Sequence, residues 1–331
     1  MGPNRARQAV RWGLYALVLA VLVRVFLQRV DAVEAADLVL PAWWAIVAAV
    51  ACFVLANEIL VRAWMGLVRL GGGELRTSLA RWVWSSTQLT RYTIGMAQVA
   101  SRAVVARRHG MSRTSGAMTT LLEVIWYSCV NALVAVATVP WWLAGTGLTW
   151  AAWLAVVPGL VLALALVAPG AFVGLASWAG RLPLLRRIGG LASASDLEVT
   201  RRDTAVLTTA YLGNFTVRLL GFVALYVGIG GPTDAWGRVL GAFALGHLIG
   251  ALAVFAPGGL GPREGVTAVV LAPLLPGGTI LALVALTRLL ELVAELLYAG
   301  MARLGHRSDA APTRMSLGSS DGPSAPPRPD I

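Results

Sequence analysis

Residues 257–265 combine glycine and proline with one arginine and one glutamate, and they separate two strongly apolar segments. Proline lacks an N–H donor and glycine loses the most backbone entropy, so this run cannot continue a helix. Arg263 is a candidate for binding phosphate through two parallel hydrogen bonds, and Glu264 would organise the cavity around it. Backbone N–H groups of the turn would add donors, and they belong to Gly258, Gly259 and Gly261.

The apolar helix expected after this break carries charge as well. Arg288, Glu291 and Glu295 are spaced i, i+3 and i+7, which places them on one face. Charges inside a membrane segment are costly and face a cavity or a partner. Glu123 and Arg218 are single charges within other apolar runs, so each requires a partner, and we expect an arginine beside Glu123. The structural alternative is an ion pair that locks the helices, with Arg263 reaching lipid headgroups from an interfacial loop.

Composition defines the elements that must hold these groups. The 331 residues are 57% hydrophobic and 13% charged, with a net charge of +11 and no lysine, whereas about a quarter of the residues in soluble domains are charged. The arginines lie in clusters between apolar runs, as in cytoplasmic loops, and not along one basic face that would bind nucleic acid. We therefore expect an all-α, polytopic helical protein of the inner (plasma) membrane with about six to eight membrane segments and both termini cytoplasmic.

Hydropathy and charge place the expected segments along the chain. Simple spans are predicted at residues 12–26, 38–61, 117–139, 150–178, 204–228 and 279–304, and prolines and glycines suggest that 150–178 is kinked or broken. Residues 82–100 are apolar but interrupted by polar residues, and basic clusters flank both ends. A re-entrant hairpin that enters from the cytoplasm and returns satisfies the charge rule. Asn57 and Glu58 are placed near the inner end of their span, where side chains reach towards the interface.

The chain also suggests an internal repeat. A first unit at about residues 38–139 and a second at about 204–304 each contain an interruption with an arginine (Arg102 or Arg263), a turn and a span with buried charge. By the charge rule, the first interruption enters the membrane from the cytoplasm and the second from outside. The two units would then be inverted repeats that meet near the bilayer midplane, an arrangement common in transporters. We assign residues 1–305 to one transmembrane domain and residues 306–331 to a disordered cytoplasmic tail.

The two interrupted blocks resemble a known family. Residues 257–265 followed by 285–297 look like the C-terminal half of the lysylphosphatidylglycerol synthase transmembrane region, a flippase-like integral membrane family. Residues 91–110 and 120–127 are similar to its first repeat, although Ile94-Gly95-Met96 lacks the proline of the family motif. The resemblance covers about residues 10–305 and implies a lipid-handling membrane module, while the sequence after the last span is too short for the soluble aminoacyl-transferase domain.

These features predict a protein that binds or moves an anionic phospholipid or a polyprenyl-linked glycolipid, with a separate lipid-modifying enzyme as a further candidate partner. The predicted substrate-binding residues are Gly258, Gly259, Gly261, Arg263, Glu264, Arg288, Glu291, Glu295, Glu123, Arg218 and Arg102. We find no catalytic or nucleotide-binding motif and expect no cofactor or metal, since the three histidines, His109, His247 and His306, are isolated in sequence. The alternatives are an enzyme acting on a polyprenyl phosphate, with these carboxylates as base or metal ligands, and a non-catalytic scaffold.

Overall fold

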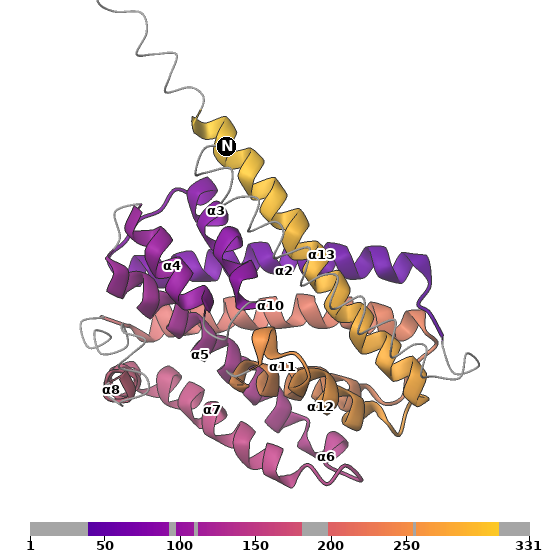
Figure 1. Cartoon of the computed structure of the whole chain (residues 1–331). Coiled ribbons are helices and arrows are strands. Elements are labelled where there is room, and N and C mark those ends of the chain that lie inside the picture. Colours follow the sequence, from indigo (N-terminus) through magenta and orange to yellow (C-terminus); the bar gives the residue numbers. More distant parts are fainter. Residues whose placement is uncertain (1–38, 93–96, 109–111, 181–197, 254–255, 311–331) are drawn as a thin grey trace, which may run out of the picture.

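The computed structural model describes residues 39–92, 97–108, 112–180, 198–253 and 256–310 (Figure 1). All regular elements in these ranges are helices, as predicted for an all-α protein. They are α2 (Trp43–Leu70), α3 (Thr77–Gln88), η2 (Leu89–Tyr92), α4 (Ala97–Arg108), α5 (Arg113–Ala137), α6 (Val139–Trp142), α7 (Thr149–Val167), α8 (Pro169–Gly180), α10 (Arg201–Gly228), α11 (Trp236–Leu252), η4 (Pro257–Gly259), α12 (Pro262–Leu271) and α13 (Gly277–Ala310). The predicted span at 12–26 and the Ile94-Gly95-Met96 segment lie outside the described residues.

Four of the described helices are long and apolar enough to cross a membrane, namely α2, α5, α7 and α10. The 28 residues of α2 extend about 42 Å at 1.5 Å per residue, more than the roughly 30 Å of a bilayer's hydrocarbon core. The predicted last span is also a helix, because α13 runs for 34 residues. It continues past His306, the residue at which we placed the start of the tail.

The two longest apolar helices, α2 and α10, lie side by side and antiparallel, and α13 crosses them (Figure 1). The N–H of Ala42 donates to the carbonyl of Gly228 at 3.1 Å, which joins the start of α2 to the end of α10. Farther along, Gly221 leaves room for the ring of Phe53, which would lie 2.8 Å from a Cβ at that position. The pair is therefore packed as closely as small residues allow between membrane helices.

Both predicted interruptions are helical hairpins with a non-α segment at the tip. In the first, α3 passes into η2 and the chain returns through α4, which packs against α3 and α5. In the second, α11 ends at Leu252 and α12 begins at Pro262, with η4 between them. Gly258, Gly259 and Gly261 have φ angles of 59°, 71° and 92°, a region that side chains with a Cβ rarely enter. The glycine break predicted at 257–265 is thus confirmed.

The predicted long span at 150–178 is broken, as its prolines suggested. Helix α7 ends at Val167, Ala168 leaves the helical region with φ −136° and ψ 75°, and α8 starts at Pro169. A proline at the first position of a helix gives up no hydrogen bond. Pro158 remains inside α7, so only the second proline separates two helices.

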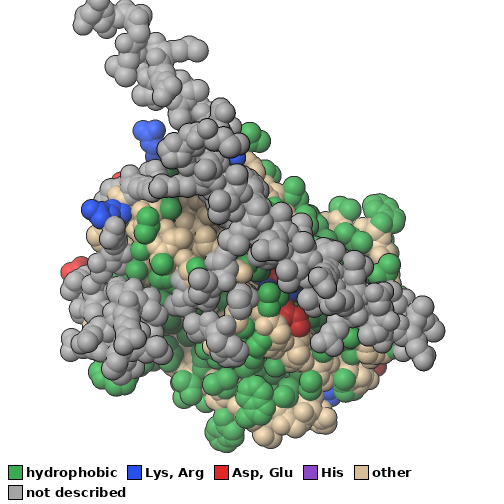
Figure 2. All heavy atoms as spheres, viewed as in Figure 1, with side chains coloured by type: hydrophobic (Ala, Val, Ile, Leu, Met, Phe, Trp, Pro, Cys, Tyr) green, Lys and Arg blue, Asp and Glu red, His purple; other side chains and the backbone are tan. Residues whose placement is uncertain are grey.

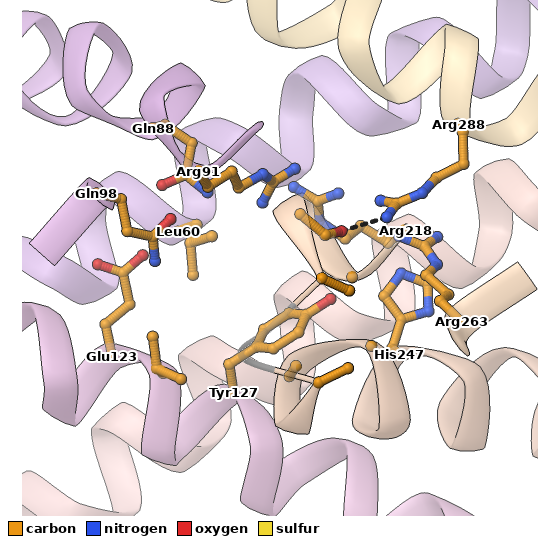
Figure 3. A pocket seen from close by; sticks show the side chains of 17 residues that line it. Leu60, Gln88, Arg91, Gln98, Glu123, Tyr127, Arg218, His247, Arg263 and Arg288 are labelled. Atoms are coloured by element: carbon orange, nitrogen blue, oxygen red, sulfur yellow. Dashed lines mark hydrogen bonds between the residues drawn. The ribbon is translucent and has the colours of Figure 1, made fainter. Parts of the chain in front are cut away.

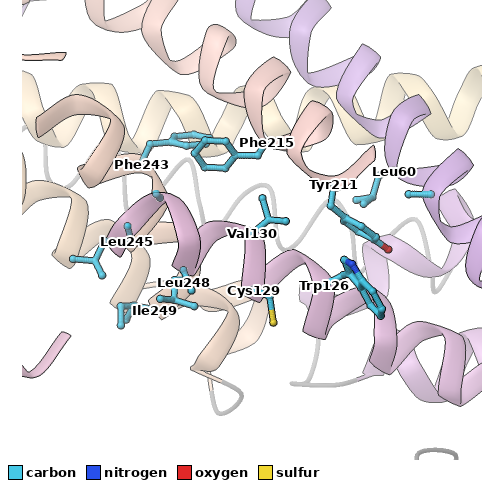
Figure 4. Close-up of a cluster of buried hydrophobic side chains, with 14 of the residues drawn as sticks. Leu60, Trp126, Cys129, Val130, Tyr211, Phe215, Phe243, Leu245, Leu248 and Ile249 are labelled. Atoms are coloured by element: carbon cyan, nitrogen blue, oxygen red, sulfur yellow. The ribbon is translucent and has the colours of Figure 1, made fainter. Parts of the chain in front are cut away.

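The hydrophobic core extends through most of the described helices, and one part of it lies where α5, α10 and α11 meet (Figure 4). Phe215 and Phe243 contact edge to face, with ring centroids 5.6 Å apart, a favourable geometry for aromatic rings. Trp126 on α5 and Tyr211 on α10 extend the same cluster. Helix α5 also packs against α4 of the first hairpin, and α11 is the first helix of the second hairpin. This part of the core therefore lies next to both hairpins.

Candidate functional site

A cavity lies between the two hairpins (Figure 3). Its volume is about 150 Å³, and it is open on one side. Four arginines line it: Arg91 from η2, Arg218 from α10, Arg263 from α12 and Arg288 from α13. In Figure 2, acidic and basic atoms are visible together near the middle of one face, next to hydrophobic side chains. The chain thus gathers cations from four separate elements around one space.

Glu291 on α13 is the carboxylate on which these cations converge. It is 1% exposed and accepts two hydrogen bonds from Arg263, one to each oxygen, at 2.8 Å. Arg288 Nη1 donates to the same carboxylate at 3.3 Å, and Arg218 Nη1 lies 3.5 Å from it. A two-pronged Arg–carboxylate pair is strong and fixes both side chains in orientation. Glu291 therefore anchors the arginine cluster without neutralising all of it.

The glycine break is attached to α13 through Arg288 and Glu264. Arg288 Nε donates to Glu264 Oε1 at 2.6 Å, and its Nη2 donates to the carbonyl of Gly258. The other oxygen of Glu264 accepts from the N–H of Gly261 at 2.6 Å, at the start of α12. These bonds satisfy backbone groups that the break would otherwise leave without partners. Glu264 lies behind the cavity wall and holds the break in place.

Arg218 is the least satisfied of the four arginines. It is 4% exposed, and its best hydrogen bond is from Nη2 to Asn57 Oδ1 at 2.9 Å. Its Nε has no hydrogen-bond partner among the described residues. A buried N–H of a cation without an acceptor is costly. The Nε of Arg91 is likewise unpaired within the described part of the chain, but Arg91 forms an ion pair with Glu295.

Arg91 connects the two hairpins. It donates from Nη2 to Glu295 on α13 and to the hydroxyl of Tyr92 at 2.9 Å. The ring of Tyr92 lies against Gly258, where a Cβ would be 2.9 Å from the ring. The tip of the first hairpin therefore contacts α13 through an ion pair, and it contacts the break of the second hairpin through the ring of Tyr92.

The predicted arginine partner of Glu123 is Arg102. Arg102 has no exposed surface, and its Nη1 donates to Glu123 Oε2. The second carboxylate oxygen accepts from the indole N–H of Trp84 at 3.1 Å. The guanidinium lies 5.1 Å from the ring centroid of Trp64 and 5.7 Å from that of Trp84, in cation–π range. This pair is internally balanced in charge.

Neutral polar groups form the opposite end of the cavity from Arg218, Arg263 and Arg288 (Figure 3). Gln88 Oε1 accepts from Arg102 Nη2 at 3.1 Å. The Oε1 of Gln98 is buried without a partner in the described part of the chain. Both glutamines and Tyr127 were absent from the predicted site. Their spacing could have revealed two of them, because Gln98 precedes Arg102 by four residues and Tyr127 follows Glu123 by four.

His247, which has no sequence neighbour of its kind, also lines the cavity. Its Nδ1 lies 2.8 Å from the carbonyl of Phe243, and its Nε2 lies 3.5 Å from Glu291 Oε1. The ring is therefore oriented by α11 and directed at the Glu291 cluster. Among the described residues, no group of three or more His, Cys, Asp or Glu could hold a metal ion.

The structure brings the predicted site residues together in two layers. Those that line the cavity are Gly258, Gly259, Arg263, Arg288, Arg218 and Glu123. Those that contact this layer from behind are Glu264, Glu291, Glu295 and Arg102, and Gly261 bonds to Glu264. The face predicted for Arg288, Glu291 and Glu295 is buried along its length.

The placement of Asn57 at a span end is wrong. Helix α2 continues to Leu70, so Asn57 lies in its middle and is 1% exposed. Glu58 does not reach towards an interface either, because it accepts from Arg81 at 2.6 Å and from Tyr298 at 2.6 Å. The arginine after the apolar run, Arg62, lies within α2 one helical turn after Glu58, and it pairs with Glu58 at 2.8 Å.

No model of a known protein family matches the chain, and no curated protein matches it. The function must therefore be argued from the geometry of the site. That geometry is a partly buried cavity with a surplus of guanidinium groups at one end and two glutamines beside the paired Glu123 at the other. It is built from two helical hairpins and supported by long apolar helices.

Proposed function

We propose that this chain is an integral membrane protein that binds an anionic lipid headgroup in the cavity and carries it across the bilayer. Large apolar side chains cover outward faces of the long helices, with Trp43 77% exposed on α2 and Trp153 75% exposed on α7. Broad apolar faces of this kind are rare on soluble monomers and match a lipid environment, with tryptophans at its interface. The proposed surroundings of the cavity are thus hydrocarbon, from which a charged headgroup must be shielded.

The surplus of positive charge in the cavity carries the proposal. The four lining arginines pair with three carboxylates, Glu264, Glu291 and Glu295. One positive charge is left over in this set, and Arg218 has the weakest bonds to protein. A cation buried without full compensation is expensive, and an anionic ligand would supply the missing partner.

The arrangement of the hairpins supports transport rather than binding alone. In each half, an arginine on the second hairpin helix pairs with a glutamate on the following long helix: Arg102 with Glu123, and Arg263 with Glu291. The antiparallel packing of α2 and α10 agrees with two units of opposite orientation. Inverted repeats with broken helices around a central site are the usual frame for alternating access. We propose membership of a flippase-like class on this basis, with both termini cytoplasmic.

The pairing of the carboxylates argues against the enzyme alternative. A general base or metal ligand needs a free oxygen within reach of the reacting group. Both oxygens of Glu291 accept from arginine, and both of Glu123 are engaged by Arg102 and Trp84. These groups orient cations, which suits anion binding.

The proposal is tested by lipid movement in proteoliposomes, with Arg218→Gln as the cavity variant. Arg263 is a poor choice, because its two bonds to Glu291 also hold α12 to α13. Arg69→Gln is the matched control, since Arg69 is exposed at the end of α2. We expect wild type and the control to move an anionic lipid equally. Arg218→Gln should move it about tenfold more slowly at equal abundance, as the loss of a charged hydrogen bond predicts.

Two results would overturn the proposal. One is equal movement by Arg218→Gln and wild type. The other is a wild-type protein that moves no anionic lipid in either direction, which would favour a scaffold whose cluster only joins helices. Circular dichroism and thermal unfolding of the same samples would separate lost transport from lost folding.

A further inference from the structure

The cavity has two chemically different ends, and together they specify more than negative charge. We propose that its ligand is a phosphodiester that joins the lipid to an uncharged polyol or sugar. The phosphate would lie among Arg218, Arg263 and Arg288, and the hydroxyl groups would face Gln88 and Gln98. This inference rests on the proposed function, because it names the headgroup that the same cavity would carry.

The charge at the arginine end matches a single negative charge. Four guanidinium groups and three carboxylates leave one positive charge in the described cavity set. A phosphodiester carries one negative charge, whereas a phosphate monoester carries about 1.5 to 2 near neutral pH. Few hydrogen-bond donors remain for a phosphate, because Arg263 already donates to Glu291 from both Nη1 and Nη2. Arg218, with a free Nε, is the residue placed to bind such a phosphate.

The end of the cavity that contains Gln88 and Gln98, which we call the amide end, suits a ligand whose groups both donate and accept hydrogen bonds. The oxygen of Gln88 accepts from Arg102, which leaves its NH₂ group as a donor towards a ligand. Gln98 offers the opposite, a buried Oε1 with no donor among the described residues. A hydroxyl group donates one hydrogen bond and accepts two, so a polyol can serve both amides at once. Tyr127 lies between the two ends, with its ring 6.3 Å from that of His247 and its hydroxyl directed towards the arginine end (Figure 3).

The same end disfavours a cationic headgroup. An ammonium group would need a free carboxylate, and Glu123 is the carboxylate that lines this end. Its oxygens are occupied by Arg102 and by the indole of Trp84. The net charge of the described cavity set is positive, which adds repulsion. An amine-bearing or aminoacylated headgroup is therefore a poor ligand for this cavity.

The cavity suits a compact headgroup that enters from its open side. Its volume of about 150 Å³ is below the roughly 300–1,000 Å³ of pockets that enclose a whole drug-sized ligand, so only the headgroup would enter it. Leu60 and the small residues Ala251, Ala253 and Ala256 also line it. Apolar walls of this kind suit the carbon atoms that link a phosphate to its hydroxyl groups.

The test is lipid binding to the full chain, purified in a neutral detergent and followed by thermal unfolding against lipid concentration. Phosphatidylglycerol represents a polyol diester, phosphatidic acid a monoester and phosphatidylethanolamine an amine-bearing diester. We expect phosphatidylglycerol to bind at least tenfold more tightly than either of the others. A polyprenyl-phosphate-linked hexose forms a fourth arm, and the tighter of it and phosphatidylglycerol identifies the source of the headgroup.

Variants assign the two ends. Arg218→Gln should weaken binding of phosphatidylglycerol and phosphatidic acid alike. Gln98→Leu should lower the affinity for phosphatidylglycerol to that for phosphatidic acid. Gln98→Met is a second probe of the amide end should Gln98→Leu fold poorly, since it keeps the length of the side chain and removes the unpaired Oε1. Arg69→Gln should match wild type with every lipid.

The outcomes separate this inference from the proposed function. One outcome is that phosphatidic acid binds as tightly as phosphatidylglycerol or more tightly, with this binding lost in Arg218→Gln. That result would overturn the polyol diester as ligand, and the cavity would remain a site for an anionic lipid. Preference for phosphatidylethanolamine would overturn the assignment of both ends. Binding of none of the anionic lipids would overturn the inference and the proposed function together.

Discussion

Arg263 donates to both carboxylate oxygens of Glu291, with N–O distances of 2.8 Å, and so fixes the start of α12 to the middle of α13. The first half of the chain contains the same connection between Arg102 on α4 and Glu123 on α5. In each half, this pair adds a charged connection between the hairpin and the next long helix, beside their packing contacts. The pairs differ in surroundings, since Arg102 lies between two indole rings and Arg263 faces the cavity.

Replacement of Glu291 by glutamine should strongly destabilise the protein. Three arginines share this carboxylate, and an amide would leave their charges uncompensated. Breaking a buried ion pair by removing one partner costs about 3–5 kcal/mol. We expect a loss of that size in the free energy of unfolding, measured by thermal or denaturant unfolding in detergent.

The exposed Glu74 offers the matched control, because Glu74→Gln makes the same chemical change at the surface between α2 and α3. Surface changes of this kind are usually within about 0.5 kcal/mol. Equal stability of the two variants would mean that the Glu291 cluster contributes nothing to the folded state.

The glycine break provides a second matched pair. Gly259 has a φ of 71°, and a Cβ there would lie 2.6 Å from the carbonyl oxygen of Gly250. Gly259→Ala should therefore lower stability by about 2 kcal/mol or more through backbone strain and overlap. Gly265 lies inside α12 with no atom near its missing Cβ, so Gly265→Ala should raise stability by about 0.5–1 kcal/mol. Thermal unfolding of both variants measures the contrast, and a shift of the same sign in both would contradict it.

Sequence reasoning located the second hairpin because proline, glycine and internal charge coincide there. Local chemistry was sufficient for that element: three glycines adopt positive φ, and Glu264 satisfies the first N–H of the turn. The i, i+3, i+7 spacing likewise placed Arg288, Glu291 and Glu295 on one buried face.

The same reasoning could not assign partners across the fold. Arg91 pairs with Glu295, although 204 positions separate them, and no spacing rule reaches that far. Asn57 was misplaced because the apolar run of α2 ends before its helix does, and Arg62 was taken as the boundary. Gln98 and His247 have ordinary sequence surroundings, and they became site residues through the meeting of α4 and α11 at one cavity.

Replacement of Trp84 tests how much its hydrogen bond to Glu123 stabilises the Arg102–Glu123 pair. Its indole N–H donates to Glu123 at 3.1 Å, and Trp84→Phe would remove this bond while keeping an aromatic ring. A hydrogen bond to a charged group contributes about 1.5–3 kcal/mol, so we expect a loss of that order in unfolding free energy. Trp153→Phe, at a position that is 75% exposed, should change stability by less than about 0.5 kcal/mol. Indistinguishable unfolding curves for the two variants would show that Glu123 needs no second donor.

The ion pair between Arg91 and Glu295 is the direct link between the tip of the first hairpin and α13. Arg91→Gln and Glu295→Gln should each destabilise the protein, because each leaves one buried charge without its partner. The double variant leaves neither charge, so its loss should be smaller than the sum of the single losses by about 1–3 kcal/mol. Unfolding of the four proteins measures this coupling, and additive losses would mean that the two side chains do not interact.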